Sequence, residues 1–132
     1  MRNLWIFAIG LLLTSCTTSS KNAVDIPTLK SEVMAIHDEV MPKMGELRKI
    51  SKELRSVAEE DSSKVQWVET ADLISNADES MMVWMRGFEP NYEGSNQEII
   101  RYLQDQKVKI ERVREDVNGS LAKGKSLLAQ LL

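Results

Sequence analysis

The sequence contains a single cysteine, Cys16, and a single histidine, His37, among its 132 residues. A single cysteine forms no disulfide within the chain, so covalent cross-links do not stabilise the fold. A Ser-His-Asp or Cys-His catalytic site would have to be built on His37 alone. A di-iron bundle needs Glu-x-x-His pairs, and the residue three before His37 is Met34. No glycine-rich phosphate loop is present either. We therefore expect no enzymatic activity.

Neither sign of charge dominates the sequence, which has 17 lysines and arginines against 20 aspartates and glutamates. A mildly acidic chain lacks the basic footprint of proteins that bind nucleic acid, so we expect no nucleic-acid partner. Alternating β-branched runs and β-hairpin signals are lacking as well. Their absence predicts a fold without strands.

The longest apolar run, residues 4–13 (LWIFAIGLLL), has only ten residues. A membrane-spanning helix needs roughly 20. The run follows Arg2 and leads into small residues, which is the pattern of a secretory signal. Residues 13–16 (LTSC) end this segment in the only cysteine of the chain. They resemble the lipobox of bacterial lipoproteins.

The lipobox resemblance implies that residues 1–15 form a cleaved signal peptide. It also implies that Cys16 carries a diacylglycerol on its sulfur and an acyl chain on its new amino group. Several acyl chains anchor a protein stably to a bilayer without a spanning helix. Thr17 follows the cysteine where an aspartate would direct enteric lipoproteins elsewhere, which indicates the outer membrane. We expect the protein to face the periplasm.

Residues 16–25 are expected to be the lipidated cysteine and a flexible tether, because the stretch TTSSKNAVD is small, polar and aperiodic. Beyond it, apolar residues recur in steps of three and four, the pattern of helices that pack along their length. The pattern predicts helices over about 26–60, 64–87 and 96–118, followed by a C-terminal extension. Short turns between them would give an all-α, up-down-up three-helix bundle of coiled-coil-like helices over residues 26–132.

Several local signals mark the ends and bends of these helices. Asp25 is a good N-cap, and Pro27 is tolerated in a first turn. Pro42 lies inside the first apolar repeat and predicts a kink near residues 38–42. Ser95 and Glu98 have the spacing of a capping box. The Asn118-Gly119 pair could end the third helix.

Two segments, 37–47 (HDEVMPKMGEL) and 77–90 (ADESMMVWMRGFEP), resemble a family of small helical lipoproteins of Bacteroidota. Some members carry the label "viral A-type inclusion protein". The family is uncharacterised, so the resemblance implies a bacterial helical bundle and brings no reaction, ligand or catalytic residue.

The six methionines beyond residue 16 fall into two clusters. The first helix carries Met34, His37, Met41 and Met44 in steps of three, four and three, which places them on one stripe. The second helix carries Met81, Met82 and Met85 around Trp84. If the first turn pairs residue 60 with residue 64, equal rise along antiparallel helices puts both clusters in one layer. The same count places Arg101 and Tyr102 near that layer.

Two interpretations of this Met/His cluster remain open. Methionine is an adaptable core residue, and it could fill irregular space around the Pro42 kink. Thioethers and imidazole also suit Cu(I) or Ag(I), so the cluster could hold a soft metal beside Trp84. The packing interpretation is favoured because methionine clusters are common in cores.

Counting levels around the second turn places residue 62 opposite residue 120. Residues 120–132 (SLAKGKSLLAQLL) would then run past the bundle with nothing to cover their leucines. Such a segment would fray, or would dock on a second copy or another envelope protein. The sequence thus predicts a lipid-anchored structural or protein-interaction module of the cell envelope, with a soft-metal-binding lipoprotein as the alternative.

Overall fold

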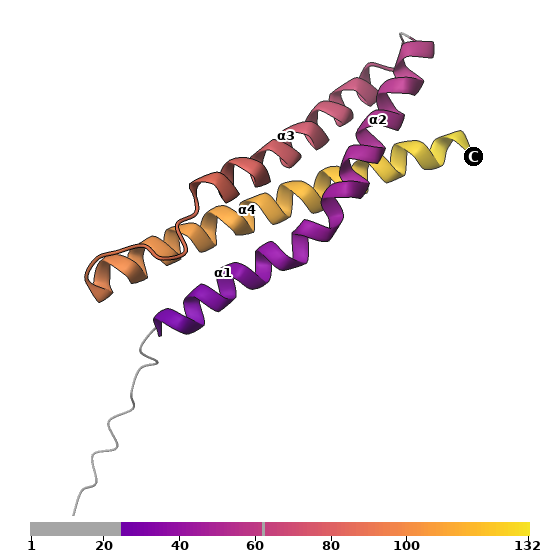
Figure 1. Cartoon of the computed structure of the whole chain (residues 1–132). Helices are drawn as coiled ribbons and strands as arrows, with labels where there is room; N and C mark the ends of the chain where they lie inside the picture. The colour runs from indigo at the N-terminus through magenta and orange to yellow at the C-terminus, as the bar shows by residue number, and fades with distance from the viewer. Residues whose placement is uncertain (1–24, 62) are drawn as a thin grey trace, which may run out of the picture.

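The computed structural model describes residues 25–61 and 63–132, and within them every regular element is helical (Figure 1). The predicted signal peptide, Cys16 and the tether up to residue 24 lie outside the described residues. The elements in chain order are α1 (Ile26–Val40), η1 (Met41–Lys43), α2 (Met44–Glu60), α3 (Val65–Gly87), α4 (Asn96–Leu128) and η2 (Ala129–Leu131). This arrangement confirms the all-α three-helix bundle, with α1 and α2 together forming its first leg.

The first leg begins and bends where the sequence predicts. The Asp25 carboxylate accepts hydrogen bonds from the backbone N–H of Thr28 at 3.3 Å and from its hydroxyl at 3.0 Å. Pro42 interrupts the leg with one 3-10 turn, η1, between α1 and α2. The missing proline N–H removes one α-helical hydrogen bond, so the chain tightens and bends at this point.

The bend determines which helices α1 and α2 touch. Before the bend, α1 packs on α4. After the bend, α2 packs on both α3 and α4. Figure 1 shows the first leg turning across α4 toward α3 at this bend. The core runs the length of the bundle, because each helix contributes apolar residues at heptad spacing. Its fully buried apolar side chains include Val33, Val40, Leu47, Leu54, Ile74, Met81, Ile110 and Val117.

Two ion pairs test the level count for the first turn, that is, the pairing of residues on the first two helices obtained by counting equal rise away from residues 60 and 64. The count pairs residue 48 with residue 76, and Arg48 in fact binds Asp78 at 2.8 Å. Arg55 binds Asp72 at 2.7 Å, three residues from its expected partner. The antiparallel register of α2 and α3 is therefore close to the predicted one.

α4 begins at the predicted capping box but does not end at the predicted residue. The backbone N–H of Ser95 donates to Glu98 at 2.8 Å, and the N–H of Glu98 donates to the Ser95 hydroxyl at 3.4 Å. The predicted end near residue 118 is wrong, because α4 continues through Gly119 to Leu128. Val117 and Leu121 are both buried on either side of Gly119, and their burial holds the chain helical there.

The prediction that residues 120–132 run past the bundle is also wrong. Leu121 and Leu127 are buried, and Gly124 lies directly against Ile50 of α2 and Ile74 of α3. The segment thus completes the core at the end where α2, α3 and α4 meet. Of its leucines, only those at the tip stay exposed, with Leu131 at 50% and Leu132 at 110% relative exposure.

The error arose at the second turn, in residues 88–95. The level count from the sequence places Ile74 opposite a residue near 108, whereas in the structure Ile74 is level with Gly124. Relative to the prediction, α4 is therefore displaced along the bundle by about 16 residues, or roughly 24 Å at 1.5 Å per residue. Eight extended residues can span at most about 26–29 Å. The segment is therefore a long connection that runs along α4 beyond the end of α3, as Figure 1 shows, and not a tight turn.

Candidate functional site

The predicted methionine–histidine stripe of the first leg meets the predicted cluster of α3. The His37 imidazole lies 5.9 Å from the Trp84 ring, measured between ring centroids. Trp84 is 7% exposed, and His37 is half-buried. His37 and Trp84 therefore meet on the N-terminal side of the Pro42 bend.

The methionines of the two clusters differ in burial. Met44 and Met81 are core residues, at 3% and 0% exposure, while Met41 and Met85 are half-buried and pack against that core. Met34 and Met82 are half-buried and lie outside this packed set. The burial of Met44 and Met81 agrees with methionine as a core-filling residue.

Two nitrogen atoms of this region differ in their partners. The His37 Nδ1 atom lies 2.9 Å from a carboxylate oxygen of Asp38, which leaves Nε2 outside that bond. The Trp84 indole Nε1 is buried and has no hydrogen-bond acceptor within the described residues. An unpaired buried donor costs about 1–3 kcal/mol, so this indole marks the least satisfied polar atom of the cluster.

An aromatic stack continues from Trp84 and explains the long second connection. Phe88 stacks on Trp84 at 4.8 Å, and Tyr102 of α4 lies between Phe88 at 6.3 Å and Tyr92 at 4.2 Å. The Tyr102 hydroxyl also accepts the backbone N–H of Glu89 at 2.6 Å. Tyr102 thereby holds residues 88–92 along α4. The prediction that Arg101 and Tyr102 lie in the layer of Trp84 is wrong, because the observed register puts about residue 114 of α4 level with Trp84. Tyr102 is connected to Trp84 only through Phe88.

The chemistry available to the Met/His cluster is that of soft ligands. Thioether sulfur and a neutral imidazole nitrogen bind Cu(I) or Ag(I), and hard cations prefer carboxylate oxygens. Across residues 25–61 and 63–132, no group of three or more His, Cys, Asp or Glu residues is placed to hold a metal ion. A soft metal at His37, Met41, Met44, Met81 or Met85 is thus the metal chemistry that the cluster could support.

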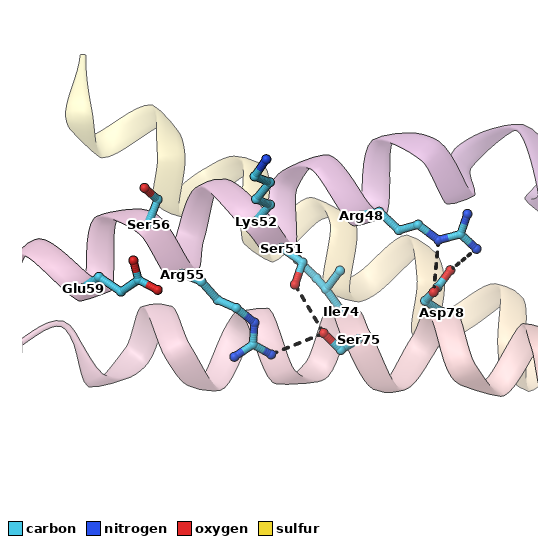
Figure 2. Close-up of a pocket in the computed structure, with 9 residues that line it drawn as sticks. All are labelled: Arg48, Ser51, Lys52, Arg55, Ser56, Glu59, Ile74, Ser75 and Asp78. Atoms are coloured by element: carbon cyan, nitrogen blue, oxygen red, sulfur yellow. Dashed lines mark hydrogen bonds and ion pairs between the residues drawn. The ribbon is translucent and has the colours of Figure 1, made fainter.

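A second candidate site, the α2–α3 groove, lies between α2 and the middle of α3 and has a volume of about 460 Å³ (Figure 2). Its α2 side carries three cations in helical steps of four and three, Arg48, Lys52 and Arg55. Across the groove, the Ser75 hydroxyl lies 3.2 Å from the Ser51 hydroxyl and 3.3 Å from the Arg55 guanidinium. The sequence pattern did not single out these residues.

The cations of the α2–α3 groove are mostly neutralised by α3. Asp78 raises the pKa of Arg48 above its ordinary value through a hydrogen bond and its charge. Asp72 forms an ion pair with Arg55 across the groove, at 2.7 Å. These pairs align α2 and α3 in register. The groove is therefore an ion-paired seam between two helices, and its charges do not converge on one reacting atom.

In comparisons with known proteins, no protein-family model, no curated protein and no solved structure matches the chain. In the part of the chain that the structure describes, none of the helices has the length and apolar character needed to cross a bilayer. The class that the structure defines is an all-α three-helix bundle.

Proposed function

We propose that this protein is a lipid-anchored lipoprotein of the bacterial cell envelope that acts as a structural or protein-interaction module. Residues 13–16 (LTSC) support the anchor, and residue 17 supports the outer membrane. The elongated bundle carries the interaction role, because α4 alone is 33 residues, or roughly 50 Å, long. Such a bundle presents long lateral faces for binding.

The anchor is tested by replacing Cys16, the residue that would carry the lipid. The full chain with Cys16→Ser should stay unprocessed or be released from the membrane fraction, because single or absent acyl chains hold a protein weakly. Fractionation and mass spectrometry of the N-terminus measure the outcome. Thr17→Ser is the matched control and should remain anchored. A Cys16→Ser chain that is processed normally and stays in the outer membrane would refute the anchor.

A second candidate function, soft-metal binding, is favoured by one observation: the His37 imidazole and the Trp84 ring bring the two methionine clusters together. In this proposal His37, Met41 and Met85, which are only half-buried, would be the reachable ligands. Trp84 would cover the ion. The buried Met44 and Met81 would complete a thioether-rich environment.

Titration with Cu(I) and Ag(I) tests this second candidate. The protein should carry Cys16→Ser so that no thiol competes for the metal. His37→Ala with Met41→Leu should abolish binding while changing the melting temperature little, since a Met→Leu exchange usually costs less than about 1.5 kcal/mol. Met82→Leu is the control and should bind like the parent, because Met82 lies outside the packed set. A parent protein that binds neither ion at micromolar concentration rules out the site.

A further inference from the structure

A second depression, the α3–α4 hollow, has a volume of about 340 Å³. Its α3 side is lined by Leu73, Asn76, Ala77 and Ser80, and its α4 side by Glu115, Asp116, Gly119, Ser120 and Lys123. It lies between helices, away from the Met/His cluster and from the α2–α3 groove. Gly119 is at the middle of the α4 side, with open space where a Cβ atom would be.

Three charged residues line the α3–α4 hollow, Glu115, Asp116 and Lys123, and none of them forms an ion pair within the described residues, unlike several cations of α4. Lys107, Lys109, Arg114 and Lys125 each form an ion pair within the bundle. Glu115 and Lys123, by contrast, form no ion pair with any residue in the described ranges. These two charges of opposite sign are therefore available to a partner.

The positions of these two charges are symmetric. Glu115 is four residues before Gly119, and Lys123 is four residues after it. When a helix pairs with a second copy of itself about a two-fold axis, each residue faces the one at equal distance on the other side of the axis. An axis near Gly119 would bring Lys123 of each copy opposite Glu115 of the other.

Two of the four exposed large apolar residues of α3 are symmetric about the same level. Leu73 is 46% exposed and Val83 is 54% exposed, and the residue midway between them is 78. Because Ile74 is level with Gly124 in the antiparallel α3–α4 pair, residue 78 is level with residue 120. The axis that pairs the charges would therefore also bring Leu73 of one copy level with Val83 of the other.

We propose that the α3–α4 hollow is the self-association face of this protein. Two copies pack antiparallel across it, with paired charges from α4 and apolar contacts from α3. The partner is a second copy of this chain, because its own charge pattern is complementary to itself about one axis. This inference does not require the lipid anchor or the metal site.

Disulfide trapping in the full chain tests the proposed axis. Gly119→Cys places a thiol next to the axis, and mild oxidation with diamide should give a covalent dimer on a non-reducing gel. The unmodified chain reports any background from Cys16. Gly45→Cys is the matched control, because Gly45 is also a helical glycine with open space and lies on α2. It should give no dimer above that background.

Charge reversal tests the pairing itself. In the Gly119→Cys background, Lys123→Glu or Glu115→Lys should each reduce the trapped dimer at least about fivefold, because like charges then face each other. The two reversals together should restore it. Within one chain these residues are eight positions apart and do not touch, so recovery can come only from a pair between copies. Absence of a Gly119→Cys dimer, or no recovery in the double reversal, would overturn the proposal.

Discussion

Replacing Gly124 with leucine should lower the free energy of unfolding by about 3 kcal/mol, near the upper range for overpacked cores. A Cβ atom at this position would lie 2.6 Å from Ile50 Cγ2 and 2.9 Å from Ile74 Cδ1. Both distances are shorter than any normal carbon–carbon contact, so α2 or α3 must move away from α4. The further atoms of leucine would enlarge that movement. Thermal unfolding followed by circular dichroism should show a melting temperature lower by roughly 10 °C.

Gly119 provides the matched control on the same helix. Its Cβ would meet nothing within 4 Å, so Gly119→Ala should gain helix propensity without a clash. We expect the melting temperature to rise, by an amount that corresponds to about 0.5–1 kcal/mol. Equal effects at Gly119 and Gly124 would mean that α2, α3 and α4 do not converge at residue 124.

Deleting residues 120–132 should abolish the cooperative unfolding transition of the bundle. The deletion removes Leu121 and Leu127, each of which contributes about 1.5–3 kcal/mol by burial. It also uncovers Ile50 and Ile74, which Gly124 contacts. The combined loss approaches the 5–15 kcal/mol that stabilises a typical domain. Loss of the circular dichroism transition would be the measured result.

A shorter deletion separates this effect from a general effect of truncation. Residues 130–132 are exposed, so their removal should change the melting temperature by only a few degrees. If the chain without residues 120–132 instead kept its helicity and its transition, that segment would be a dispensable tail, as the level count from the sequence predicted.

The helices themselves could be predicted because local chemistry and periodicity agreed. The Asp25 cap, the Pro42 bend and the Ser95–Glu98 capping box each depend on residues within one or two turns. The register of α2 and α3 was also accessible, because a short turn leaves little freedom in where the second helix begins.

The register of α4 could not be predicted from local signals. It depends on residues 88–95 running along the bundle, and on Tyr102 packing between Phe88 and Tyr92, which lie on the other side of the capping box. The Asn118-Gly119 pair has a weak helix propensity, but burial of the residues around it outweighs that preference. Once the register is known, the apolar residues beyond position 120 belong to the core.

The candidate sites also divide into one that local sequence signals could predict and two that depend on the register between helices. The stripe through His37, Met41 and Met44 could be found because it lies on one continuous leg of the bundle, formed by α1, η1 and α2, and the first-turn register placed it near Trp84. The α2–α3 groove and the α3–α4 hollow require residues from two helices in a defined register. The symmetry of Glu115 and Lys123 about Gly119 became informative only when neither residue was found in an ion pair within the described bundle.

The positions of the chain ends in the bundle determine how the proposed antiparallel pair would be oriented relative to a membrane. α1 begins at one end, beside the first turns of α4, while the α2–α3 turn lies at the other end (Figure 1). In the proposed antiparallel pair, the two α1 N-termini, which would lead to the proposed Cys16 anchors, would therefore lie at opposite ends, separated by a length on the order of 50 Å. A tether of nine residues reaches at most about 30 Å. Two copies anchored in one membrane would then lie with their long axes parallel to its surface, with one anchor at each end of the pair.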